Sequence, residues 1–276
     1  MRTFLSKNSC IIFFFAVLAM GAVSSEMRGL YETEFTMDAV HANNDYDTVT
    51  MTMTSYKFGN LKINLRGSGP LTIDWGDGAI ESRRLTPGIL AYSHHYNNGT
   101  RRTIIIYGQN ITHLTCEGCR LTGLDISNNT ELKFLHCARN RLTHLDVGKN
   151  IALTNLVCDN NQLTVLDLSA NTALTVLHCS NNELKSLDVN KNRSLTNLIC
   201  EGNFLTGLYA SNTEALMLLN CRKNKLSAEA LNTLFNVLNA TKEEGKLLYI
   251  RNNPGTGACN QTIATDKHWK IDTSFI

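Results

Sequence analysis

The sequence lacks an excess of charge of either sign. Its 276 residues include 26 Lys and Arg and 24 Asp and Glu, which gives a formal net charge of +2 at pH 7. Residues 1–24 contain two basic residues, Arg2 and Lys7, and no acidic one, so the chain without them is formally neutral. Binding to a phosphate backbone needs a concentration of basic side chains, and this chain has no such cluster. A nucleic-acid partner is therefore not expected.

Long hydrophobic runs are also scarce, since only Cys10–Met20 (CIIFFFAVLAM) stands out. The two basic residues precede this run and the small residues Ala22-Val23-Ser24 follow it, a pattern typical of a signal peptide over residues 1–24. An uncleaved anchor is the alternative, although the run is short for a spanning helix. We expect an exported protein, extracellular or in the cell envelope, with no membrane-spanning segment in the mature chain. Surface attachment, free secretion and periplasmic residence stay open.

Catalytic motifs are missing as well. The chain has no G-x-S-x-G, no H-E-x-x-H and no P-loop, and its eight histidines are scattered along the sequence. We therefore predict that it is not an enzyme and that it needs no cofactor.

What the sequence does contain is a 21-residue repeat. Copies begin at Ile111, Leu132, Leu153, Leu174 and Leu195, for example LTNLVCDNNQLTVLDLSANTA from Leu153, and a sixth begins at Leu216. No residue is inserted or deleted over five full copies, which indicates a stack of structural repeats.

The alternation within each copy predicts which residues point inward. Leu135 and Cys137 are two residues apart, so they share one face of an extended segment. Leu142, Leu145 and Val147 are expected to form the opposite wall.

The pattern L-x-x-L-x-C-x-x-N-x-L-x-x-L-D-x-S resembles the leucine-rich repeat over residues 111–231. It is specifically similar to the short bacterial variety with a cysteine ladder found in internalin J-like surface proteins. The resemblance implies a right-handed solenoid of about six turns, each with one short parallel strand, and a role as an adhesin-like binding protein.

Two ladders of identical residues are expected inside this solenoid. The cysteines are Cys116, Cys137, Cys158, Cys179, Cys200 and Cys221. The asparagines, whose amides can bond the backbone of adjacent turns, are Asn140, Asn161, Asn182, Asn203 and Asn224. In the first repeat Cys119 takes the asparagine position.

The ladder cysteines are predicted to be free thiols that pack as small hydrophobes. Neighbouring strands hold equivalent Cβ atoms about 4.8 Å apart, whereas a disulfide needs about 3.8 Å. The alternative, a metal bound by pairs such as His136 and Cys137, is disfavoured because adjacent residues of a strand point to opposite faces. A disulfide between Cys119 and Cys259 is disfavoured too, since these residues lie at opposite ends of the repeats. No metal site is expected.

The segment before the repeats is expected to be all-β. Residues 25–47 show no sustained period and are expected to form a linker, with a leading strand as the alternative. Residues 48–55, 61–65, 71–75 and 103–108 have strand-like patterns, so residues 48–109 are predicted to form a sandwich-like domain that caps the repeats. The string Asp74-Trp75-Gly76-Asp77-Gly78 and the later His94-His95-Tyr96 resemble the marks of the polycystic-kidney-disease (PKD) repeat. Calcium binding by Asp74 and Asp77 is the alternative to ordinary turn chemistry.

Residues 227–276 are predicted to form an α/β C-terminal cap. Ser227–Asn239 has apolar residues at helical spacing, with Ser227 as the N-cap. A strand at 247–250 and a second helix at about 259–266 should follow, with Trp269 as a core residue of the cap.

The outward-pointing strand residues are the candidate binding surface. They form two rows that are unexpectedly apolar, flanked by Glu117, Asp159, Glu201 and Arg222. The residues predicted to bind a protein partner are Phe134, His136, Val157, Val176, His178, Ile199 and Leu218. The alternative is that β-branched residues are present for strand propensity alone. A glycan-binding module, which would favour several exposed aromatic residues, and a structural accessory of an envelope assembly are the rival functions.

A carboxylate ladder is expected on the opposite wall at Asp125, Asp146, Asp167 and Asp188. Its simplest partners are backbone N–H groups of the turn that follows each aspartate. A row of bound cations is the alternative.

Overall fold

The computed structural model describes residues 49–272, and side chains are described for 51–271. The predicted signal peptide and linker lie outside these residues. The described part of the chain belongs to one compact unit. Within it, no helix is long and apolar enough to span a membrane.

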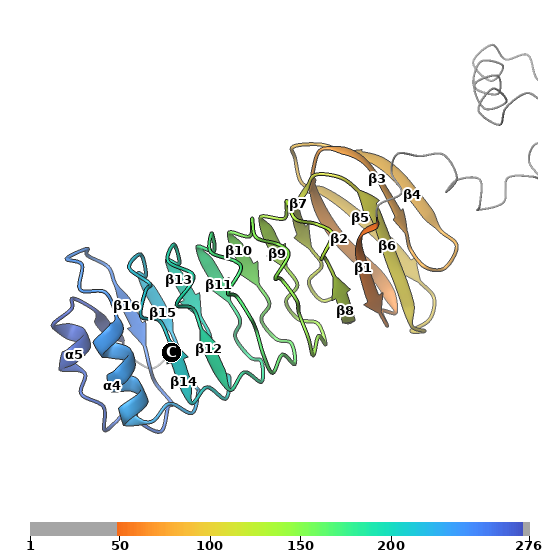
Figure 1. Cartoon of the computed structure of the whole chain (residues 1–276). Coiled ribbons are helices and arrows are strands. Elements are labelled where there is room, and N and C mark those ends of the chain that lie inside the picture. Colours follow the sequence, from red (N-terminus) through yellow and green to blue (C-terminus); the bar gives the residue numbers. More distant parts are fainter. Residues whose placement is uncertain (1–48, 273–276) are drawn as a thin grey trace, which may run out of the picture. The chain divides into compact units, whose positions relative to one another are not determined.

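A long parallel sheet runs through the repeats (Figure 1). Each strand pairs in register with the strand one turn later, so that Asn155 of one strand lies beside Val176 of the next. This confirms the predicted repeat solenoid with one short parallel strand per turn. The strands from the repeats are β7 (Ile111–Thr115), β9 (Phe134–His136), β10 (Asn155–Val157), β11 (Val176–His178), β13 (Asn197–Ile199) and β15 (Leu218–Asn220).

The prediction of about six turns was too low, because two further strands, β16 (Leu247–Tyr249) and β17 (Lys270–Asp272), extend the parallel sheet. Ile250 is buried like the ladder cysteines, and Asn253 bonds the backbone as the ladder asparagines do. Leu247 pairs with Leu218, which is farther back in the sequence than one repeat length, so a search at the fixed repeat period does not detect this turn. The predicted C-terminal cap therefore continues the solenoid.

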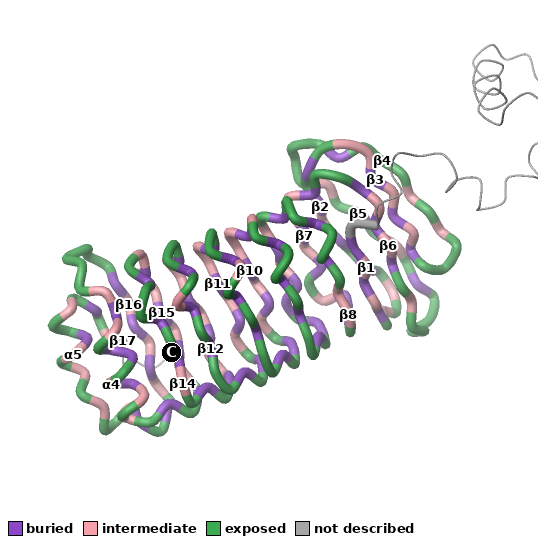
Figure 2. The backbone as a smooth tube through the Cα atoms, in the orientation of Figure 1, coloured by how far each residue is buried: buried purple, intermediate pink, exposed green. Residues whose placement is uncertain are grey.

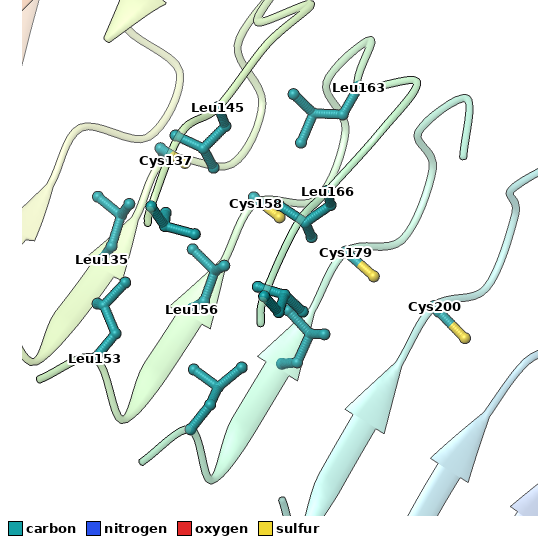
Figure 3. Close-up of a cluster of buried hydrophobic side chains, with 14 of the residues drawn as sticks. Leu135, Cys137, Leu145, Leu153, Leu156, Cys158, Leu163, Leu166, Cys179 and Cys200 are labelled. Atoms are coloured by element: carbon teal, nitrogen blue, oxygen red, sulfur yellow. The ribbon is translucent and has the colours of Figure 1, made fainter. Parts of the chain in front are cut away.

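The core of the solenoid lies between this sheet and an opposite wall. The wall contains the short parallel strands β12 (Ser186–Asp188) and β14 (Gly207–Tyr209). Inward side chains of both walls, such as Leu135, Cys137 and Leu142, have no exposed surface. Figure 2 shows the buried positions recurring in every turn, and Figure 3 shows Cys137, Cys158, Cys179 and Cys200 at equivalent places in successive turns.

Asparagine side chains satisfy the backbone where the chain leaves each strand. The Asn161 amide Nδ2 donates to the carbonyl oxygens of Cys137 and Cys158, both at 3.0 Å. Its Oδ1 accepts the N–H of Leu142 at 3.0 Å. The same arrangement recurs at Asn140, Asn182, Asn203 and Asn224.

A second asparagine ladder, not among the predicted core residues, follows the opposite wall. Its members Asn150, Asn171 and Asn192 have no exposed surface. Asn171 Nδ2 donates to the carbonyl oxygens of Val147 and Asn150, at 3.0 and 2.9 Å. The repeats that begin at Leu132, Leu153 and Leu174 therefore have a buried asparagine amide at both ends, where the turns leave carbonyl groups that water cannot reach.

The described segment before the repeats contains six strands. They are β1 (Val49–Ser55), β2 (Gly59–Gly67), β3 (Gly69–Asp74), β4 (Ile80–Leu85), β5 (Leu90–Tyr96) and β6 (Arg102–Gly108). The sequence patterns predict neither β4 nor β5. Strand β4 escapes prediction because its residues, IESRRL, are mainly polar. Charged residues are common on an edge strand, and β4 is the edge of its sheet.

The six strands belong to two sheets, and each sheet also contains a strand from beyond residues 109–111, the predicted boundary with the repeats. Strand β2 pairs with β7 and so extends the long sheet, with β5 at its edge. Strand β1 pairs with β8 (Leu121–Asp125) of the first repeat, in a sheet of order β4-β3-β6-β1-β8. The Ser55 hydroxyl also donates to the Cys119 carbonyl at 2.7 Å. These pairings cover the first turn of the solenoid.

The two sequence marks of this segment lie against each other. His94 stacks on Trp75, with ring centroids 5.2 Å apart, and its Nε2 is 2.7 Å from Asp77 Oδ2. The Tyr96 hydroxyl donates to the Trp75 carbonyl at 2.7 Å. Asp77 Oδ1 accepts the N–H of Ala79 at 3.2 Å. One oxygen of the Asp77 carboxylate is therefore bonded within the turn, and the other lies against His94 of β5.

One helix lies in the segment between β15 and β16. Helix α4 (Ala228–Val237) begins after Ser227, whose side chain accepts the N–H of Ala230, as predicted for an N-cap. Helix α5 (Thr262–Thr265) is shorter than predicted, because Asn260 Oδ1 accepts the N–H of Thr262 and the residues before it form turns. Trp269 is buried, which confirms its prediction as a core residue.

Candidate functional site

The outward side chains of the long sheet form a continuous surface, which we call the outer face. Side chains that lie beside each other on neighbouring strands form two rows across the sheet. Row 1 contains Arg66, His113, Phe134, Asn155, Val176, Asn197, Leu218 and Leu247. Row 2 contains Asn64, Thr115, His136, Val157, His178, Ile199, Asn220 and Tyr249. Strands β2 and β16 lengthen both rows beyond the repeats recognised in the sequence.

The residues predicted to bind a partner all lie in these rows, but they are half-buried rather than exposed. Equivalent side chains on neighbouring strands are only about 4.8 Å apart, so each covers part of the next. Phe134, for example, stacks on His113 with ring centroids 5.7 Å apart.

Apolar and polar side chains alternate along the outer face. From β9 to β15 each strand contributes one of each kind, and the apolar residue changes row from one strand to the next. The apolar members form a zigzag line that we call the apolar zigzag: Phe134, Val157, Val176, Ile199 and Leu218.

An acidic residue lies beside row 2 at every second turn, and two of the three have strong cationic partners. Glu117 is 3.4 Å from Arg139 Nε and 3.7 Å from His136 Nε2. Glu201 forms ion pairs with Arg222 and Lys223, both at 2.9 Å. Asp159 accepts the backbone N–H of Ser180 at 2.6 Å, and within residues 51–271 it forms no ion pair.

Burial and hydrogen bonding act in opposite directions on these carboxylates. Burial raises the pKa of Glu201, but hydrogen bonds from Lys223, Asn220 and Arg222 outweigh it and lower the pKa to about 2. For Asp159 the effect of burial is the larger one. Burial raises the pKa of Asp159, although the Ser180 N–H and the nearby His178 favour the charged form.

Replacing Glu201 with glutamine is expected to lower the free energy of unfolding at pH 7 by about 1 kcal/mol after allowance for solvent screening. The folded pKa of about 2 lies below the ordinary value of 4.5, so the stabilisation is present above 4.5 and is lost as pH falls toward 2. Urea titrations of both proteins between pH 7 and pH 2 measure this. Glu183→Gln, at an exposed position, is the control. A difference between wild type and variant that stays constant over this range would contradict the assignment.

The aspartates of the opposite wall each bond the backbone two residues later. Asp146 Oδ1 accepts the N–H of Gly148 at 2.8 Å, and Asp167 Oδ1 accepts that of Ser169 at 2.9 Å. Asp125 and Asp188 do the same with Ser127 and Asn190. Among the described residues, no group of three or more His, Cys, Asp or Glu side chains is arranged to hold a metal ion.

The ladder cysteines are buried free thiols, and so is Cys119, whereas Cys259 is free and partly exposed. Burial raises the pKa of Cys137 and Cys221 to about 12. A thiol in this environment stays protonated at neutral pH and is a poor nucleophile, so these side chains act in packing.

A solved structure with a cysteine ladder is similar to this chain. It is the functional domain of InlJ from Listeria monocytogenes, which includes such a ladder. The two share 27% sequence identity, with a TM-score of 0.42. The match covers 63% of this chain and 42% of the InlJ chain, less than half of its length. No family model and no curated protein matches the chain.

Proposed function

We propose that this chain is an exported, non-enzymatic, adhesin-like binding protein whose outer face engages a protein partner. The observation that carries the proposal is the apolar zigzag, which places one apolar side chain on each of five successive strands, diagonally from one strand to the next. Surfaces that combine apolar and polar side chains in this way are typical of interaction sites on proteins.

The surroundings of the zigzag also favour a protein partner. Asn155, Asn197, His136 and His178 alternate with the apolar residues and offer hydrogen-bonding groups at regular intervals. An interface that combines apolar contacts with polar groups of this kind suits another polypeptide. A glycan is less well suited, because stacking on sugar rings favours a continuous row of aromatic residues and the polar members of these rows are mainly asparagine and histidine.

Replacing Phe134, Val157 and Ile199 together with serine is expected to weaken partner binding at least about tenfold, because each loses apolar contact area. The measurement is quantitative mass spectrometry of proteins captured from the organism's surroundings on the immobilised mature chain, followed by titration of any captured protein.

The matched control replaces Phe204, Val165 and Ile151 with serine. These residues have the same three side chains, are 49%, 69% and 62% exposed, and lie off the outer face. The melting temperature of each variant separates lost binding from lost folding. Equal binding by the outer-face variant and the wild type would refute the proposal.

A further inference from the structure

The three acidic residues beside row 2 occupy equivalent positions in the solenoid, two turns apart from one another. The residue one turn and one position after each acid lies close to it on the next turn. After Glu117 it is Arg139, after Glu201 it is Lys223, and both form ion pairs with the preceding acid. After Asp159 it is Asn181, which carries no charge.

The side chain of Asn181 does not compensate Asp159. Arg139, Asn181 and Lys223 share the same left-handed backbone, with φ of 56°, 52° and 53°. The Asn181 side chain lies over Gly202, because a Cβ atom on that glycine would be only 2.4 Å from Asn181 Oδ1. Within the part of the chain with described side chains, Asp159 is therefore the member of this acidic series without a lysine or arginine partner.

Asp159 nevertheless lies in the middle of the candidate interface. It follows Val157 of the apolar zigzag by two residues, and it is partly buried. The neighbouring strands place His136 and His178 close enough to favour its charged form, so they lower its pKa against the effect of burial. A partly buried carboxylate that lacks a strong cation leaves a favourable interaction unmade, and a binding partner can supply it.

We propose that the protein partner presents a lysine or arginine side chain to Asp159, flanked by apolar residues that pack on Val157, Val176 and Ile199. This inference rests on the proposed function and names the chemistry of the partner. Beside Asp159 the partner's cation takes the place that Arg139 has beside Glu117 and Lys223 has beside Glu201. Each of the three carboxylates is then paired with a cation.

The test uses a displayed library of short random peptides, selected on the immobilised mature protein. Selected peptides are synthesised, and their affinities are measured by fluorescence polarisation. We expect them to share one lysine or arginine between apolar residues. Asp159→Asn, which keeps an acceptor for the Ser180 N–H, should weaken their binding about tenfold or more. Asp167→Asn, on the opposite wall, should leave it unchanged.

Two further measurements isolate the charge pair. A peptide whose basic residue is replaced with glutamine should bind the wild type and Asp159→Asn equally, which is the signature of direct coupling. Asn181→Lys should also weaken the basic peptides about tenfold, because it supplies the cation from within the chain. Lysine is compatible with this backbone, since Lys223 adopts it. This variant keeps the test decisive if Asp159→Asn does not fold.

The failure of this inference and the failure of the proposed function are distinguishable. Two results overturn the basic-residue inference and leave the outer face as a binding site. In the first, the selected peptides depend on Ile199 but share no basic residue. In the second, Asp159→Asn weakens the binding of a peptide equally whether its basic residue is present or replaced with glutamine. If no selected peptide depends on the outer face, the proposed function fails, and this inference fails with it.

Discussion

Replacing Asn161 with alanine is expected to lower the free energy of unfolding by about 3–5 kcal/mol. The substitution removes the donor to the Cys137 and Cys158 carbonyls and the acceptor of the Leu142 N–H. These backbone groups are buried between adjacent turns, and each unsatisfied buried group costs about 1–3 kcal/mol. The loss is concentrated at one interface, because each repeat of a solenoid contacts only its neighbours.

Urea unfolding followed by circular dichroism measures the effect of Asn161→Ala. Asn197→Ala is the matched control, since Asn197 is the same residue type but lies half-buried on the outer face, where water can reach its side chain. We expect the control to change stability by less than about 0.5 kcal/mol. Similar losses in both variants would show that the ladder amide contributes no more than an ordinary polar side chain.

Replacing Lys246 with methionine is expected to cost about 3–4 kcal/mol, although methionine is more hydrophobic. Lys246 is only 1% exposed. Its Nζ donates to the carbonyl oxygens of Asn239, Thr241 and Lys267, at 3.2, 2.7 and 2.6 Å, and lies 5.4 Å from the centre of the Trp269 ring. Methionine leaves these carbonyls without their charged donor, and bonds to charged groups contribute more than neutral ones.

The same unfolding measurement applies to Lys246→Met, with Lys225→Met at an exposed position as the control. Near-ultraviolet circular dichroism should also show a changed environment of Trp269, because the ammonium group lies over its ring. A variant as stable as the wild type would mean that the carbonyls of Asn239, Thr241 and Lys267 find other donors.

Much of the solenoid was predictable, because its sequence repeats without insertions. The unbroken period places Cys137, Cys158 and Cys179 at equivalent positions in the core and sets the strand register of each turn. Prediction failed where this spacing changes. The loop that holds α4 lengthens the distance in sequence between the paired residues Leu218 and Leu247, so the turns formed by β16 and β17 were assigned to a cap instead.

The sequence predicted which residues form the outer face, but it did not predict which of the acidic residues beside it are paired with cations. The sequence alone determined which residues share the outer face, because alternation along a strand and the repeat length are local properties of the chain. Only the tertiary structure decided that Glu117 and Glu201 are paired by Arg139 and Lys223 on the next turn, that the side chain of Asn181 lies over Gly202, and that Lys246 is buried. These outcomes depend on distances between side chains of different turns, which the period alone does not specify.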